Sequence, residues 1–265
     1  CSSDLYKPFV DRYCSGQREA SNLRELNFNL WKYCMFRREK SLVLTDLPDK
    51  IRQVNTCEIT NRKEYMDAER DLIMYLQKYK DADDDKIAKA MRGEVMVRIN
   101  ILRQISARGK VRDVIEFVKD FRENGKKIIL FCSLHEVVDQ LKRYFPTAVS
   151  VTGRDSQDEK QRAVDAFQNN PKADIIICSI KAAGVGLTLT ASSNVAFVEF
   201  PWTYADCCQC EDRAHRIGQK DSVTCYYFLG RRTIDEKVYR IIQEKKNIAN
   251  AVTGSTEDIE ENIVD

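Results

Sequence analysis

Two arginines near the end of the chain have the spacing that suits polyphosphate binding. In the segment Gln209-Cys-Glu-Asp-Arg-Ala-His-Arg-Ile-Gly-Gln219, Arg213 and Arg216 follow Gln209 by four and seven residues. If the segment is helical, the three side chains share one face. Two planar guanidinium groups at a helix end closed by Gly218 can donate hydrogen bonds to one anion. The alternative is an ordinary solvent-exposed helix face with internal ion pairs.

A second segment combines glycines with polar side chains. Ser179-Ile-Lys-Ala-Ala-Gly-Val-Gly-Leu-Thr-Leu189 follows directly on the apolar run ADIIIC, which we expect to be a buried strand. Beyond the carboxyl end of such a strand, Gly184 and Gly186 would let backbone amides approach a ligand closely. We expect three nearby side chains to contact phosphates: those of Ser179, Lys181 and Thr188. Glycine pairs are also common in plain turns, which is the alternative.

Polar residues follow two other expected strands. Thr152-Gly153-Arg154 ends the stretch AVSVTGR and precedes a helix for which Ser156 is the expected N-cap, and Ser133 follows IILFC. The carboxyl ends of parallel strands meet at one edge of a sheet, and ligands of open α/β sheets bind there. We therefore expect these residues to line one edge together with Ser179.

The elements that position these residues alternate along the second half of the chain. Apolar runs predict five strands, at 127–132, 148–153, 173–180, 194–200 and 222–229. Amphipathic runs predict helices between and around them, at 111–123, 135–145, 156–168, 203–216 and 233–252. This order predicts an α/β fold with a doubly wound parallel sheet and helices on both faces.

The first 110 residues have a different pattern. After a short apolar stretch at 51–59, the segment 61–108 is helical in pattern and rich in charge, and an acidic cluster at 81–85 interrupts it. One face of its first helix is apolar, with Tyr65, Leu72, Leu76 and Tyr79. We expect a junction at 1–50, an N-terminal helical insertion at 51–110, an α/β lobe at 111–252 and an acidic tail at 253–265.

Composition places the chain among folded globular proteins. Of its 265 residues, 43% are hydrophobic and 32% are charged, and the formal net charge is +2. The tail carries five acidic residues and no basic ones, so the rest of the chain has a larger positive surplus, which is compatible with a nucleic-acid or phosphate partner. No apolar run reaches the roughly 18 residues of a membrane span. No signal-peptide pattern follows Cys1, so we expect an intracellular piece of a longer protein.

Ten cysteines raise the question of disulfides or metal. Most lie in apolar or helical surroundings, which is typical of free thiols in a reducing compartment. Cys207, Cys208 and Cys210 contain a C-x-x-C spacing, so a zinc or redox protein is one hypothesis. Because no second Cys/His pair follows at finger-like spacing, we favour a buried helix face.

These segments, in this order, resemble motifs IV, V and VI of the superfamily 2 helicase-like ATPases. The wording D-R-A-H-R-I-G-Q at 212–219 resembles that of the SWI/SNF-type DNA translocases. Met35-Phe-Arg37-Arg38-Glu-Lys40 and Leu47-Pro48-Asp-Lys50 resemble that family's junction between two lobes. Arg12-Tyr13-Cys14 and Ala20-Ser21-Asn22-Leu23 resemble its annealing-helicase branch. By this resemblance the chain is a second, RecA-like lobe, and residues 1–50 are the end of the first lobe and the junction between the two lobes.

The resemblance implies a role for each of these residues. Arg213 and Arg216 would be arginine fingers that reach the γ-phosphate of ATP held on the other lobe. Gln209, Gly184 and Gly186 would bind the nucleotide or couple it to DNA. The implied contacts to the DNA backbone come from Ser133, Thr152, Gly153, Arg154, Ser179, Lys181 and Thr188. Arg37 and Arg38 would lie at the hinge between lobes, and Lys245 and Lys246 would brace one lobe on the other.

The chain contains neither a G-x-x-x-x-G-K-[ST] segment nor a D-E-x-H segment. Both are needed to hold the nucleotide phosphates and Mg²⁺, so ATP and Mg²⁺ would be bound mainly by a first lobe outside this chain. We expect the full-length protein to be a DNA-dependent ATP hydrolase that moves on mainly duplex DNA, and this chain alone to be inactive. The alternative is a non-catalytic DNA- or protein-binding module with the same fold. The expected location is intracellular: the cytoplasm if the source is a bacterium or a phage, and the nucleus if it is a eukaryote.

Overall fold

The computed structural model divides the chain into two compact units. The larger unit comprises Leu47–Tyr239 and Ile259–Asp265, and the smaller unit comprises Cys1–Asp46 and Arg240–Asp258. The residues that the structure describes are 3–14, 20–38, 40–44, 46–80, 85–183, 186–253 and 261–264.

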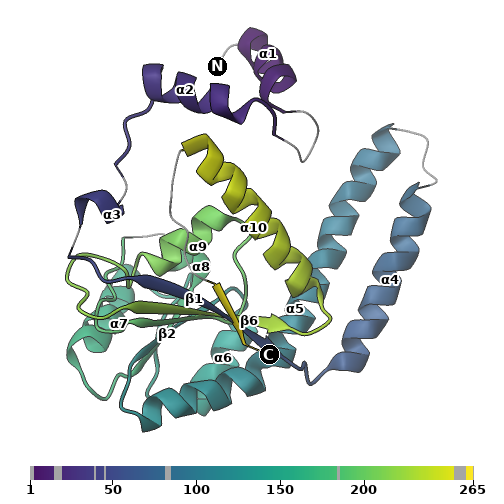
Figure 1. The fold of residues 1–265 in the computed structure, drawn as a ribbon. Coiled ribbons are helices and arrows are strands. Elements are labelled where there is room, and N and C mark those ends of the chain that lie inside the picture. Colours follow the sequence, from purple (N-terminus) through teal and green to yellow (C-terminus); the bar gives the residue numbers. More distant parts are fainter. Residues whose placement is uncertain are drawn as a thin grey trace. The chain divides into compact units, whose positions relative to one another are not determined.

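A parallel sheet forms the core of the larger unit (Figure 1). Its strand order is β3-β4-β2-β5-β6-β1-β7, and every pairing is parallel. The strands are β1 (Lys50–Cys57), β2 (Ile128–Cys132), β3 (Val149–Val151), β4 (Ile175–Ser179), β5 (Asn194–Phe197), β6 (Val223–Gly230) and β7 (Glu261–Val264). The sheet confirms the α/β fold class and contains two strands, β1 and β7, beyond the five expected.

Helices cover both faces of this sheet. The helices that lie wholly or partly in the larger unit are α4 (Arg62–Lys80), α5 (Asp85–Glu123), α6 (His135–Tyr144), α7 (Gln157–Asn169), α8 (Ile180–Ala183), α9 (Tyr204–Glu211) and α10 (Ile234–Thr253). In β6, the rings of Tyr226 and Phe228 contact Phe117 of α5, whereas the hydroxyl of Tyr227 donates to Glu211 of α9. Every residue of β2 and of β4 is buried, as expected for central strands.

Local signals end and begin helices where the sequence predicts. Gly125, with φ 65°, follows α5, and Lys126 N–H donates to the carbonyl of Phe121 at 2.9 Å. This hydrogen bond, with that from Gly125 N–H to the Arg122 carbonyl, is the Schellman arrangement that glycine favours. At the start of α7, Ser156 and Glu159 form a capping box.

Residues 51–57 of the stretch at 51–59 belong to the sheet, which corrects their assignment to the helical insertion. Strand β1 pairs with β6 along its whole length, from Lys50 opposite Val223 to Cys57 opposite Gly230. Part of the expected acidic tail is also in the sheet, because residues 261–264 form β7 beside β1. The rest of the tail after Thr253 lies outside the described residues. The division into four domains stays a prediction.

The expected helical hairpin is present, but its second helix does not end near residue 110. Helix α5 runs unbroken from Asp85 to Glu123, through Gly109. The missing side chain lets α5 approach the segment before α4: a Cβ at Gly109 would lie 2.7 Å from Cβ of Ile59. Between the helices the buried apolar residues are Ile59, Tyr65, Leu72, Leu102 and Ile105. The expected contact at Leu76 is half-exposed, and the side chain of Tyr79 and residues 81–84 lie outside the described part.

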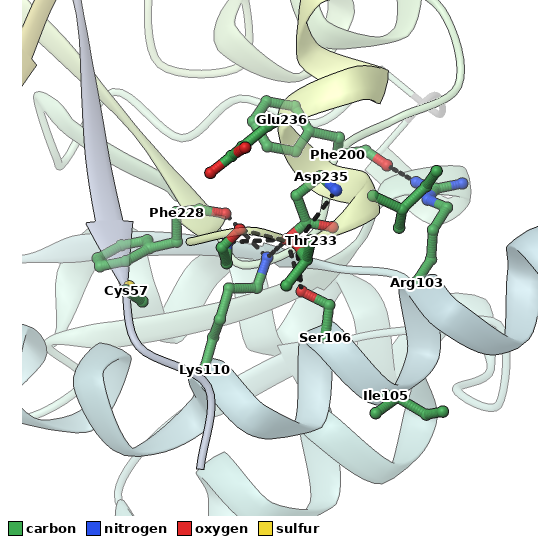
Figure 2. Close-up of polar contacts among 12 residues, drawn as sticks. Cys57, Arg103, Ile105, Ser106, Lys110, Phe200, Phe228, Thr233, Asp235 and Glu236 are labelled. Carbon is green, nitrogen blue, oxygen red and sulfur yellow. Dashed lines mark hydrogen bonds and ion pairs between the residues drawn. The ribbon is translucent and has the colours of Figure 1, made fainter. Parts of the chain in front are cut away.

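A buried polar network joins α5, β6 and α10 (Figure 2). The ammonium of Lys110 donates to Oδ2 of Asp235 at 2.6 Å and to the carbonyl of Phe228 at 2.8 Å. The same Oδ2 accepts from Ser106 Oγ at 2.8 Å and from Gly230 N–H at 3.0 Å. Because Lys110 is only 1% exposed, this ion pair has no help from solvent.

The smaller unit contains α1 (Ser3–Tyr13), α2 (Leu23–Tyr33) and α3 (Lys40–Val43). Arg12 donates two hydrogen bonds of 2.8 Å to the carboxylate of Glu25, which ties α1 to α2. Asn27 of α2 donates to the carbonyl of Val252 at the end of α10. These contacts hold the unit's own helices together.

Candidate functional site

The expected polar edge exists at three neighbouring strands. Ser133 follows β2, Thr152 follows β3 and Ser179 ends β4. Since β3, β4 and β2 are adjacent and parallel, their carboxyl ends lie side by side. The structure therefore brings these three residues to one edge, as the sequence predicts.

Two of the hydroxyls at this edge serve the protein's own turns. Thr152 is 4% exposed, and its N–H and Oγ1 both donate to Oδ2 of Asp155. Ser179 is 8% exposed, and its Oγ accepts from Ala182 N–H at 3.2 Å. Their contact with DNA stays a prediction, and it would require these hydrogen bonds to be shared or broken.

Other predicted DNA contacts are exposed. The side chain of Arg154 is 56% exposed, and its Nη1 lies 3.1 Å from the Asp139 carboxylate. An exposed pair of this kind contributes about 0–1 kcal/mol, so the arginine can exchange its carboxylate partner for a phosphate. Lys181 on α8, Thr188 and Gly153 are also exposed. A Cβ at Gly153 would meet open space, so no close approach requires glycine there.

Glu199 is a residue at this edge that the sequence analysis missed. Its Oε1 accepts from the N–H groups of Ser133 and Leu134, at 3.0 and 2.9 Å, just before α6. Burial raises the pKa of Glu199, and these two hydrogen bonds hold back the rise. The backbone amide of Ser133 is thus already bonded to a carboxylate, which leaves its exposed hydroxyl for a ligand. The position of an acid just after an apolar strand was the available signal.

In the glycine-containing segment after β4, Gly184 and Val185 lie outside the described residues, and the description resumes at Gly186. Gly186 has φ 47°, a conformation that favours glycine, and Thr188 is exposed. Leu189 N–H donates to the carbonyl of Arg213 at 2.9 Å. This hydrogen bond joins the glycine segment to the arginine segment, two groups that the sequence places 24 residues apart.

The prediction that Gln209, Arg213 and Arg216 share one helix face is wrong. Helix α9 ends at Glu211 and Asp212 is its C-cap, so both arginines lie in the turns that follow. Tertiary hydrogen bonds replace the helical ones there, including the bond from Leu189 to Arg213. Gln209 is exposed on the last turn of α9.

This arginine loop, residues 212–219, is held at several points. The ring Nε2 of His215 lies 2.8 Å from the carbonyl of Pro48, to which it donates. The side-chain amide of Gln219 donates to the carbonyls of Ser192 and Ala214 at 3.0 and 3.3 Å. Between these points Arg216 and Ile217 are exposed, and Ile217 is 74% exposed. A fixed loop with an exposed tip suits presentation of a guanidinium to a ligand.

The arginine loop and the polar edge are separate. The loop leads into the amino end of β6, and Gln219 binds the carbonyl of Ser192, which precedes β5. Ser133, Thr152 and Ser179 lie at the carboxyl ends of their strands. The structure thus places the arginine loop toward the edge of the sheet opposite Ser133, Thr152 and Ser179, whereas the segment with Gly186 and Thr188 lies beside the loop.

The expected hinge and brace residues belong to the smaller unit. Arg37 is half-buried and Arg38 is exposed, with its guanidinium 5.4 Å from the ring centre of Phe36. On α10, Lys245 is exposed and Lys246 is buried. Their roles at an interface between lobes stay predictions.

The cysteines of α9 lie on a buried helix face, as we favoured. Cys207 and Cys210 are buried, and burial raises the pKa of both thiols. Within the described ranges, no group of three or more Cys, His, Asp or Glu side chains is arranged to hold a metal ion. Nor does any helix in the described part combine the length and apolar character that crossing a bilayer needs.

Comparison with known proteins identifies the family of this chain. Residues 109–218 match the family described as "Helicase conserved C-terminal domain". The chain is 30% identical over 255 residues to the SWI/SNF-related matrix-associated actin-dependent regulator of chromatin subfamily A-like protein 1 of Xenopus tropicalis, covering 91% of this chain and 26% of the relative. It is 30% identical over 270 residues to the human DNA annealing helicase and endonuclease ZRANB3, covering 94% and 24%. The chain thus spans about a quarter of the length of these curated relatives.

Solved structures share the fold. The Sulfolobus solfataricus SWI2/SNF2 ATPase core in complex with dsDNA aligns with a TM-score of 0.62 and 21% identity, over 94% of this chain and 56% of that one. The C-terminal part of the Fun30 ATPase domain aligns with a TM-score of 0.63 and 17% identity, over 74% and 89%. The fold and the family match together define a RecA-like helicase C-terminal lobe. The chain belongs to the SWI/SNF-type family of superfamily 2 and forms its second lobe, and annealing helicases are among the relatives that it matches.

Proposed function

We propose that the full-length protein couples ATP hydrolysis to movement along duplex DNA, and that this chain is its second motor lobe. In this proposal Arg213 and Arg216 stabilise the γ-phosphate of ATP during hydrolysis. Gln209 and the glycine segment couple the nucleotide to DNA. The protein works wherever duplex DNA is kept, in the nucleus of a eukaryote or the cytoplasm of a bacterium.

The observation that carries the proposal is the hydrogen bond between Leu189 and Arg213. It links the arginine loop directly to the segment that bears Gly186 and Thr188, one of the proposed DNA contacts. A displacement of either segment therefore acts on the other. Such a link is what a motor needs, since nucleotide state and DNA contact must change together.

We propose that ATP and Mg²⁺ are held mainly outside this chain. The described part of the chain contributes guanidinium groups and no cluster of metal-binding carboxylates. An arginine supplied to a nucleotide bound elsewhere can raise the rate of phosphoryl transfer by about 10³–10⁵. This division of labour supports an inactive isolated chain and an active full-length protein.

DNA contact in this proposal is made to the phosphate backbone. The exposed candidates are Arg154, Lys181 and Thr188. The predicted DNA contacts include no aromatic residue on which a base could stack. Binding by such contacts has little sequence preference and weakens steeply with salt. Binding to several unrelated duplexes at two salt concentrations measures both properties.

The decisive experiment is phosphate release by the full-length protein, with and without duplex DNA. DNA should stimulate turnover, and Arg216→Ala should reduce kcat by about 10³-fold or more. Arg143→Ala removes another exposed arginine, on α6, and should leave kcat unchanged. A full-length protein that binds DNA without turning over ATP would instead support the non-catalytic module. Turnover by the isolated chain that Arg216→Ala abolishes would contradict the assignment of ATP to another lobe.

A further inference from the structure

A fully buried carboxylate lies at the start of the arginine loop. Glu211, the last residue of α9, has no exposed surface. Its oxygens accept from Arg52 Nε and Nη2 at 2.6 and 2.7 Å, from Lys50 Nζ at 3.0 Å and from Tyr227 Oη at 2.5 Å. Two of the three donor residues belong to β1, so Glu211 joins the end of α9 to the entry of that strand.

A gain in the stability of the fold does not by itself explain this buried ionic network. Removing charges from water is costly, and apolar side chains of similar size often stabilise a core as well or better. Arg52 Nη1 is buried and makes no hydrogen bond within the described part of the chain, which adds to that cost. Burial would raise the pKa of Glu211, but Lys50 and Arg52 outweigh it and lower that pKa to about 2. The carboxylate is therefore charged at every physiological pH, and what it secures is geometry.

The geometry that it secures is that of the arginine loop. Ala214 and His215 N–H groups both donate to the backbone carbonyl of Glu211, at 3.1 and 3.0 Å. His215 also donates from its ring to the carbonyl of Pro48, two residues before Lys50. The segment from Pro48 to Arg52 thus holds the last residue of α9, directly before the loop, and holds the loop again at its middle. Pro48 and Lys50 belong to the stretch Leu47-Pro48-Asp-Lys50, to which the proposed function assigns no role.

We propose that Glu211 is a positioning residue, which ties the arginine loop to the residues that enter β1 and so fixes where Arg213 and Arg216 point. Resting on the proposed function, this inference adds that the chain leading into β1 controls arginine placement. A shift of Pro48 and Lys50 moves the loop through Glu211 and His215. The arginines reach the nucleotide only while these contacts are intact.

Hydrogen–deuterium exchange on this chain tests the positioning role without ATP. In Glu211→Gln, the protected amides at 212–215 should exchange about tenfold faster or more, because local opening no longer breaks an ionic anchor. Lys50→Met should have a smaller effect in the same direction, and it serves if Glu211→Gln does not fold. Asp235→Asn is the matched control, since it weakens a buried Lys–carboxylate pair on another part of the sheet. It should leave the ratio of exchange at 212–215 to exchange in β4 unchanged. Wild-type exchange at 212–215 in both Glu211→Gln and Lys50→Met would overturn the proposal.

Kinetics of the full-length protein separate positioning from mere stability. Glu211→Gln should lower kcat by about 10²-fold, the usual effect of a misplacement near 1 Å, with KM for ATP and affinity for DNA unchanged. Asp235→Asn should keep wild-type kcat below its melting temperature. An active wild type whose kcat does not change in Glu211→Gln overturns the positioning role alone. A wild type without DNA-stimulated turnover refutes the proposed function, and the exchange result then decides whether Glu211 still orders the loop.

Discussion

The buried network of Lys110 and Asp235 makes a sharp prediction about stability. In Asp235→Ala, Oδ2 disappears, and with it the bonds from Lys110 Nζ, Ser106 Oγ and Gly230 N–H. Lys110 is then left 1% exposed with a single carbonyl partner, that of Phe228. The variant thus strands a cation in the core and frees the turn that begins α10 (Figure 2).

The magnitude follows from that geometry. Removing one partner of a buried ion pair destabilises a protein by about 3–5 kcal/mol, because the other charge stays buried without compensation. Asp235→Asn keeps an oxygen that can accept from Ser106 and Gly230, so the loss of stability in this variant should lie near the lower end of that range. In Lys110→Met/Asp235→Asn the stranded cation is gone as well. We therefore expect the double variant to lose less than the sum of the singles, by about 1–3 kcal/mol.

Urea unfolding at pH 7, followed by far-ultraviolet circular dichroism, measures these free energies. The double-mutant cycle consists of the wild type, Lys110→Met, Asp235→Asn and the double variant. These four proteins should share one m-value, so that their urea midpoints report stability alone. A loss below about 1 kcal/mol in Asp235→Ala would show that the pair is solvated or unformed. Strict additivity in the double variant would show that the two residues do not interact, and either result would refute the reasoning.

Three other predictions concern different parts of the larger unit and the thiols. The lowered pKa of Glu211 means that its charge stabilises the fold above the unfolded value of 4.5 and that this contribution is lost as pH falls toward 2. The stability of the wild type should therefore drop by up to about 3 kcal/mol more than that of Glu211→Gln over this interval, and parallel pH curves would contradict it. Gly109→Ala should destabilise by about 1–3 kcal/mol through overlap with Ile59, whereas Gly93→Ala on the same helix, with nothing within 4 Å of the new Cβ, should stabilise by about 0.5–1 kcal/mol. Equal effects at the two glycines would refute the close contact. Brief alkylation read by mass spectrometry should label the exposed thiols of Cys14 and Cys34. It should spare the buried thiols, whose pKa burial raises, namely those of Cys132, Cys178 and Cys225. Label on these buried thiols in the folded protein would contradict their place in the core.

Elements with a local cause could be predicted from the sequence. The apolar runs of β2 and β4 are buried on both faces, and their short length and β-branched isoleucines favour a central parallel strand. The end of α5 is determined by Gly125 and the start of α7 by Ser156 and Glu159, all within a few residues. In such segments the propensity and the final structure agree.

Elements with a distant cause were missed. Strand β1 contains Arg52, a residue type that normally lies at the surface, and its burial depends on Glu211, 159 residues away. The residues after Glu211 favour a helix, but contacts to Leu189 and Pro48 turn the chain out of it. The residues around β1 do not indicate its contact with Glu211, and those after Glu211 do not indicate their contacts with Leu189 and Pro48.

The candidate site divides in the same way. Sequence motifs identify Arg213 and Arg216, and the strand order brings Ser133 and Thr152 to one edge. They do not reveal that the hydroxyl of Thr152 is buried on Asp155, because that depends on the depth of a turn below the surface.

The position of β1 in the sheet has a consequence for how the chain assembles during synthesis. Strands β2, β4 and β5 are made close together and can pair as they emerge, whereas β1 is made first and its neighbours β6 and β7 last. Pairing over such a separation is slow, and an unpaired strand is a template for aggregation. Strand β1 stays hydrated before it pairs because it contains the polar residues Lys50, Arg52, Gln53 and Asn55. The polar residues that make this strand hard to recognise in the sequence therefore also protect it from aggregation until β6 and β7 pair with it.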